Sequence, residues 1–167
     1  MSECVNLVYK AECYPCGVPP VHKTGEATTR AHLLKLEDAI HTLPELLDMD
    51  AMTHHHFAPG LYAREFRMNA DDLVVGKIHK HDHLAMLVYG VASVTDEFNK
   101  VRMKGPHIWL SQAGVKRAVY AHTDCMFVTF HPAEETDLEK IEEFVIAPSY
   151  EALDALKLEG LVCLGEQ

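Results

Sequence analysis

Apolar and polar residues alternate through the middle of the chain, most regularly over residues 61–68 (LYAREFRM). Such alternation predicts half-buried strands, because successive side chains of an extended chain point to opposite faces. Residues 122–124 predict a hairpin turn between the last two strands. Further strands are predicted at residues 73–79, 84–89, 91–95, 101–103, 107–111, 117–121 and 126–131. Many short strands with turns between them are typical of a sandwich or barrel, and a double-sheet jelly roll closes such a series.

Helical periodicity flanks this strand-rich part. Thr29 precedes a predicted helix, and Pro44 is expected to end or bend it. Its apolar stripe recurs at three- and four-residue steps, at Leu33, Leu36, Ile40 and Leu43. Beyond residue 132, Thr136 and Glu139 form a capping-box pattern ahead of one short helix, and Ser149 precedes another. The pattern therefore predicts a mainly β protein with a helix before the strands and short helices after them.

The same reading divides the chain into four parts. Residues 1–28 carry several prolines and glycines without periodicity and are expected to form a flexible arm. Residues 29–54 form a helical extension, residues 55–132 the β-barrel, and residues 133–167 a C-terminal helical extension. A single apolar stripe on a short helix must pack on something, which together with the resemblance described below favours a homodimer or larger homo-oligomer.

Charge and composition exclude several classes of function. The formal net charge of −10 disfavours nucleic acid as a partner, because an acidic surface repels phosphate backbones. We find no apolar run near the roughly 18 residues of a membrane span, and no secretory signal. Five cysteines, an odd number without an export signal, argue against a disulfide framework and for a reducing cytoplasm.

Histidines mark the candidate chemistry. His79, His81 and His83 occupy alternate positions and would converge on one metal ion if the segment stays extended, whereas a tight bend would send one of them elsewhere. Neutral imidazole binds several divalent transition metals, so zinc, iron, nickel and manganese are not distinguishable here.

Residues 76–90 (GKIHKHDHLAMLVYG) resemble the first cupin motif, in which glycine precedes a His-x-His pair, a glutamate and a closing glycine. With Gly90 as the closing glycine, His79 takes the place of the second histidine and His83 that of the glutamate. Lys77 takes the place of the first histidine. In residues 112–117 (QAGVKR), which resemble the second motif, Arg117 replaces the final histidine, and an arginine does not bind metal. The resemblance implies a single cupin jelly-roll barrel.

A narrower resemblance covers residues 55–153, which are similar to small cupin-like proteins of tailed bacteriophages. The pieces that carry it are residues 55–65, 76–80, 114–117 and 135–142. It implies the same fold and, for a phage-encoded protein, the host cytoplasm. It implies little about chemistry, because the cupin fold hosts many unrelated functions.

His79 and His83 are thus the leading metal ligands, and His131 is the candidate third. If residues 122–124 are a hairpin turn, antiparallel pairing brings His131 near Arg117. His131 would then supply the imidazole that is missing because Arg117 replaces the final histidine of the motif. The alternative is that His131 ends a strand beside a loop.

Three more residues are candidates for an outer role or for ligand binding. His81 falls in the turn between the ligand strands, and Arg117 is a candidate partner for a small anionic ligand. Glu65 either faces the barrel interior or pairs on the surface with Arg64 or Arg67. Lys116 is expected to have a plain surface role.

A second metal site is a weaker hypothesis. Cys13 and Cys16 are spaced like half of a zinc knuckle, but a closed site needs four ligands, and free thiols in a mobile arm are the alternative.

These observations lead to three functional hypotheses. The first is a bacteriophage-type cupin protein that binds a divalent transition metal through barrel histidines, without an assigned activity. The second is a metal-dependent cupin enzyme, of dioxygenase, isomerase or lyase type, acting on a small anionic metabolite. The third is a non-catalytic phage accessory or virion-associated protein.

Overall fold

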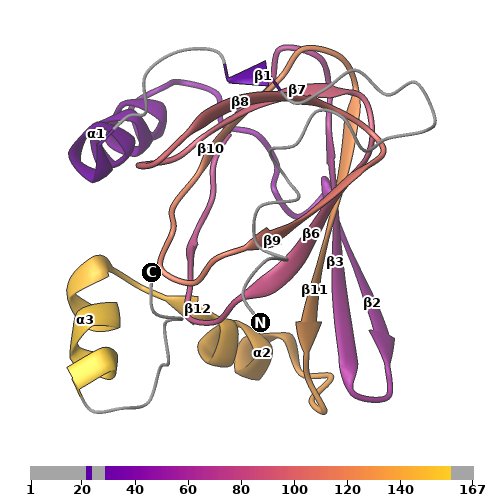
Figure 1. Ribbon diagram of the computed structural model, residues 1–167, viewed down its shortest axis with the longest axis vertical. Coiled ribbons are helices and arrows are strands. Elements are labelled where there is room, and N and C mark those ends of the chain that lie inside the picture. Colours follow the sequence, from indigo (N-terminus) through magenta and orange to yellow (C-terminus); the bar gives the residue numbers. More distant parts are fainter. Residues whose placement is uncertain (1–21, 24–28, 159–167) are drawn as a thin grey trace.

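A computed structural model describes residues 22–23 and 29–158 of the chain; the predicted arm, with Cys13 and Cys16, lies outside the described residues apart from His22 and Lys23. Its centre is a jelly-roll barrel of two facing antiparallel sheets of five strands (Figure 1). In order across the first sheet, the strands are β1 (His22–Lys23), β8 (Lys100–Lys104), β7 (Val91–Thr95), β10 (Ala118–Ala121) and β4 (Leu73–Val75). In the second they are β2 (Thr53–Ala58), β3 (Leu61–Met68), β11 (Cys125–Pro132), β6 (His83–Tyr89) and β9 (His107–Ser111). The mainly β fold predicted from the sequence is confirmed.

The core fills the space between the two sheets. Alternate residues of the strands point inward, as the sequence pattern predicts, and they include Leu87, Ala92, Ala121 and Cys125, each 0% exposed. Phe66 and Met68 of β3 join them from the second sheet, and Val94 and Met103 from the first. Burial of these side chains is the main force that holds the two sheets together.

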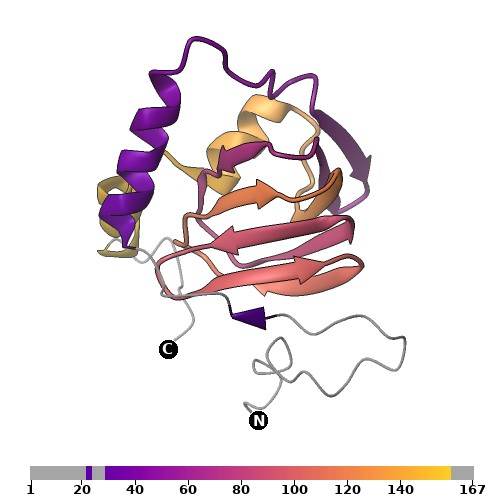
Figure 2. The same ribbon diagram turned by 90° about the horizontal axis from the view of Figure 1, so that it is seen from above.

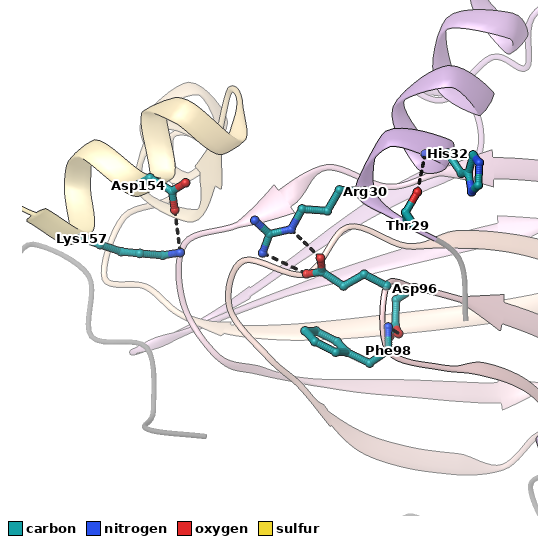
Figure 3. Close-up of polar contacts among 8 residues, drawn as sticks. Thr29, Arg30, His32, Asp96, Phe98, Asp154 and Lys157 are labelled. Atoms are coloured by element: carbon teal, nitrogen blue, oxygen red, sulfur yellow. Dashed lines mark hydrogen bonds and ion pairs between the residues drawn. The ribbon is translucent and has the colours of Figure 1, made fainter. Parts of the chain in front are cut away.

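The helix α1 (Arg30–His41) lies beside the first sheet (Figure 2). The Thr29 hydroxyl caps it by accepting a hydrogen bond from the His32 amide, as expected, but the helix ends before Pro44. Of its apolar stripe only Leu33 is fully buried. Figure 3 shows the Arg30 guanidinium directed at the turn after β7, where it pairs with Glu97 at 2.5 Å. Asp96 in that turn accepts hydrogen bonds from the Phe98 and Asn99 amides.

Two short helices follow the barrel. α2 (Leu138–Val145) is capped by Asp137, whose carboxylate accepts a hydrogen bond from the Glu139 amide, so the predicted capping by Thr136 is wrong by one residue. α3 (Tyr150–Leu158) begins after Ser149, whose hydroxyl accepts from the Ala152 amide. Between them β12 (Ile146–Ala147) pairs with β5 (Ile78–His79) and closes one end of the barrel. None of the helices in the described part of the chain is long and apolar enough to cross a membrane.

The predicted hairpin at residues 122–124 is wrong. β10 pairs with β4 and β7, whereas β11 pairs with β3 and β6, so residues 122–124 carry the chain from one sheet to the other. Local sequence shows a turn but not whether the strands beside it pair, because that depends on which sheet each strand joins. The argument that placed His131 beside Arg117 by pairing across this turn therefore fails.

Candidate metal centre

The chain bends sharply between β5 and β6, and this bend decides which histidines meet. Residues 80 and 81 leave the extended conformation. The Lys80 amide donates to the Val145 carbonyl at 2.8 Å, and the Asp82 carboxylate accepts from the Ala113 amide at 2.7 Å. The Gly114 amide donates to the carbonyl of His79 at 2.8 Å. The bend is thus fixed from both sides, and it breaks the simple alternation of side chains between residues 79 and 83.

His79, His83 and His131 meet at the end of the barrel that α2 covers. Nδ1 of His79 lies 3.0 Å from ring nitrogens of His83, and the two ring centroids are 4.1 Å apart. The ring of His131, from β11, lies 4.5 Å from that of His83 and 5.1 Å from that of His79. One nitrogen from each residue can be chosen so that all three lie within 4.8 Å of one another. The structure therefore brings together the three histidines predicted from the sequence.

Burial keeps these imidazoles neutral. His83 and His131 are 6% and 4% exposed, and His79 is partly buried. Loss of hydration lowers the pKa of His79 to about 2, of His83 to about 4 and of His131 to about 3, with further lowering of the first by its neighbouring histidines. At neutral pH all three present a lone pair, which is the form that binds metal.

Neighbouring groups orient two of the rings. Nδ1 of His83 donates to the carbonyl of His81 at 3.3 Å, and Nε2 of His131 lies 3.1 Å from the Thr129 hydroxyl. Tyr62 stacks on His131 at 6.0 Å between centroids, and its hydroxyl is 2.7 Å from Nδ1 of His55. Such partners fix which nitrogen of His83 and of His131 faces the centre of the cluster.

The other histidine of the motif and the glutamate lie elsewhere. His81 is not part of the ligand group and packs on Phe144 of α2, at 4.9 Å between ring centroids, although its charge also lowers the pKa of His131. Glu65 points to the outer face of β3, where it accepts hydrogen bonds from Arg67 at 2.6 Å and from His56 at 3.1 Å. The hydrogen bond from Arg67 lowers the pKa of Glu65. Glu65 therefore takes its surface alternative, with Arg67 and His56 as partners.

The two basic residues after Gly114 differ from each other. Arg117 donates to the Ser111 hydroxyl at 2.8 Å and lies 3.5 Å from the Asp96 carboxylate. Its charge also lowers the pKa of His79 and His83, so it lies within electrostatic reach of the cluster. The expected surface role of Lys116 is wrong: the residue is 5% exposed, and its ammonium pairs with Glu37 of α1 at 2.8 Å.

Neither Arg64 nor Tyr62 was expected from the sequence to lie beside the cluster. Both lie at alternate positions of β3 on the same inward face as Phe66, and the charge of Arg64 lowers the pKa of His79 and His131. The alternation in residues 61–68 contained the signal, because an arginine at an inward position of a barrel strand is unusual.

The donor set fits a divalent transition metal. Three imidazoles are the protein ligands of one class of catalytic zinc site. Softer metals favour sulfur ligands and harder metals favour oxygen ligands. The metal-ligating group found among the described residues contains neither carboxylate nor thiolate, so calcium and magnesium, which prefer oxygen, fit poorly.

Comparison with known proteins finds similarity at the level of structure. No family model matches the sequence, and no curated protein matches it. A cupin 2 domain-containing protein from Halorhodospira halophila shares 15% identity over 70% of this chain and 82% of its own, with a TM-score of 0.46. KdgF from Halomonas sp. shares 16% identity over 53% and 88%, with a TM-score of 0.43. A cupin superfamily protein from Desulfitobacterium hafniense shares 12% over 48% and 74%, with a TM-score of 0.42.

Proposed function

We propose that the barrel binds one divalent transition metal ion through His79, His83 and His131. The observation that carries the proposal is the meeting of three buried, neutral imidazoles from β5, β6 and β11. Bringing three polar rings into an apolar barrel end costs free energy, and a bound ion would offset it. His131 supplies from the second sheet the third imidazole that Lys77 and Arg117 do not provide.

Elemental analysis of the purified chain tests the proposal. We expect close to one transition-metal ion per chain, and loss of most of it in the double variant His79→Ala, His83→Ala. His131→Ala should lower affinity for zinc at least tenfold in calorimetry. His81→Ala is the matched control, because it removes an imidazole from the same segment whose ring faces Phe144 rather than the cluster. Equal metal content in the control and the double variant would overturn the assignment.

A second candidate function is catalysis on a small anionic metabolite. Among the described residues the metal-ligating group holds three histidines, so an ion there would keep coordination positions for water or substrate. A bound metal would supply Lewis acidity or an acidified water at those positions. The guanidinium groups of Arg64 and Arg117, whose charges reach the cluster, favour an anionic substrate.

The state of the open positions separates an enzyme from a phage accessory protein that uses a metal only structurally. Cobalt-substituted protein should show a visible spectrum that changes when azide is added, because azide enters an open position. An unchanged spectrum at saturating azide would indicate a closed site and favour the accessory role.

A further inference from the structure

Arg64 is an interior arginine whose contacting partners, Thr53 and Phe66, are neutral. It shares the inward face of β3 with Tyr62 and Phe66, which are 5% and 9% exposed. In the strand register it lies opposite Thr129 of β11, whose hydroxyl is 3.1 Å from Nε2 of His131. The backbone of Arg64 therefore lies one cross-strand pair from the cluster, and the charge of its guanidinium lowers the pKa of His79 and His131.

The partners of Arg64 do not balance its charge. One guanidinium nitrogen donates to the Thr53 hydroxyl at 3.3 Å, and the group lies 5.3 Å from the centroid of the Phe66 ring. No carboxylate of the described residues lies within ion-pair distance of it, whereas Arg30 and Arg67 each have one at about 2.5–2.6 Å. The nearest carboxylate charge that acts on it is that of Glu142, which acts beyond ion-pair distance and is itself paired with Lys77. A partly buried cation whose charge is only distantly balanced is costly, and its charge adds to that of any metal nearby.

We infer that Arg64 binds the carboxylate of a small ligand at the metal centre, with the guanidinium on one side of that carboxylate and the metal on the other. This inference rests on the proposed metal site. A planar guanidinium matches a carboxylate in shape and can donate two parallel hydrogen bonds to it. Arg117, the residue expected for this role, already donates to Ser111 and lies beside Asp96.

Calorimetry with malonate on the zinc-loaded full chain tests the inference, with sodium chloride at matched ionic strength as the blank. We expect Arg64→Gln to weaken malonate binding at least tenfold and to leave zinc stoichiometry unchanged. Arg67→Gln is the matched control, because Arg67 lies on the same strand but on its exposed outer face. Arg64→Lys keeps the charge but loses the planar pair of donors, so its affinity for malonate should lie between those of wild type and Arg64→Gln. It also replaces Arg64→Gln as the test variant if that protein does not fold.

The outcomes separate this inference from the proposed function. If wild type binds one zinc ion per chain but Arg64→Gln leaves malonate affinity unchanged, only the role of Arg64 is overturned. The same holds if zinc-loaded wild type does not bind malonate. Absence of zinc binding in wild type would instead overturn the metal proposal and the inference with it.

A separate observation concerns the outer face of the second sheet, which is apolar where a solvent-facing sheet is normally polar. Leu84 on β6 and Ile108 and Leu110 on β9 are 50%, 51% and 43% exposed. The register sets Leu84 opposite Leu110 and sets Met86 opposite Ile108. On the other side of β6, Phe130 and Val128 of β11 continue the block. Figure 1 shows α1 and α3 on the far side of the barrel, so they do not cover this face.

This block lacks charge although the chain carries ten net negative charges. No outward position of β6, β9 or β11 holds a lysine, arginine, aspartate or glutamate, and the first charged side chains on this face are Glu65 and Arg67 of β3. Copies of an acidic protein repel each other over most of their surface, so a neutral apolar face is where two copies can approach.

We propose that this face binds a second copy of the chain, sheet against sheet about a two-fold axis. The uncharged block of three strands, about 4.8 Å apart and about 20 Å long, spans roughly 300 Å² in projection, and the whole five-strand face, with its polar rim on β3 and β2, spans roughly 500 Å². The contoured accessible surface of such a face is larger and approaches the roughly 800 Å² per partner of a standard interface. The homo-oligomer expected from the sequence is thus assigned to this sheet rather than to the stripe on α1, where Leu33 is already buried against the barrel.

Sedimentation velocity at micromolar concentration tests the assignment. We expect a wild-type dimer, and a monomer for Ile108→Glu. Leu46→Glu, at a residue 55% exposed outside the sheet, is the matched control and should remain dimeric. A monomeric wild type would overturn the proposal and leave the face to another occupant, such as an end segment of this chain or a different protein. A dimer that survives Ile108→Glu would overturn it as well.

Discussion

The buried ion pair between Lys116 and Glu37 provides a sharp test of how α1 is held to the barrel. The ammonium and carboxylate are 2.8 Å apart, and their side chains are 6% and 30% exposed. Glu37→Leu leaves the ammonium in a dry site without its partner. Removing one member of a fully buried pair costs roughly 3–5 kcal/mol, and partial exposure of the carboxylate reduces this to about 2–3 kcal/mol.

Removing the lysine instead of the glutamate should cost less stability. In Lys116→Met the apolar stem is kept, and the carboxylate of Glu37 can turn to solvent, so we expect a loss of about 1 kcal/mol. The double variant Glu37→Leu, Lys116→Met removes both charges and should lie within about 1 kcal/mol of wild type. The two changes are therefore predicted to be non-additive by about 2–4 kcal/mol.

Urea unfolding at pH 7, followed by circular dichroism, measures these differences. Asp154→Leu is the control, because Asp154 pairs with Lys157 at a similar distance, 2.9 Å, but is 57% exposed (Figure 3). It should cost under about 1 kcal/mol. A loss of less than about 0.5 kcal/mol for Glu37→Leu would refute the reasoning. So would a loss that disappears in about 1 M salt, since salt screens exposed pairs far more than buried ones.

Three further predictions follow from burial and backbone conformation. The folded state lowers the pKa of the three site histidines, so as the pH falls the unfolded chain binds protons before the folded protein does. The metal-free protein should therefore lose about 1.4 kcal/mol of unfolding free energy per histidine between pH 7.5 and 5.5. A chelator-treated protein whose stability does not change over this range would count against the prediction. Gly90→Ala should cost about 1–3 kcal/mol in urea unfolding, because φ is +96° and a methyl would lie 2.6 Å from Cys125 Sγ, whereas Gly76→Ala has ordinary room. Leu153→Ala, at a fully buried side chain, should cost about 2–5 kcal/mol, and a loss as small as that of Leu158→Ala, at 90% exposure, would contradict the packing.

The sequence determined the elements and most of the inward faces. Alternation over residues 61–68 corresponds residue for residue to β3, and residues 91–95 to β7. The Thr29 cap and the helix after Ser149 were likewise predicted, because capping and periodicity depend on residues within a few positions of each other. Spacing around Gly90 and the motif resemblance also singled out His79 and His83.

Only the tertiary structure decided which strands pair and which side chains meet. His131 reaches the cluster because β11 lies between β3 and β6 in the second sheet, not by pairing across residues 122–124. His81 leaves the cluster because the bend at residues 80–81 is fixed by α2 and by the segment around Ala113. Burial of Lys116 and the interior position of Arg64 depend in the same way on elements distant in sequence. Local pattern specifies the face of a strand, but contacts between strands arise from long-range packing that no short window of sequence contains.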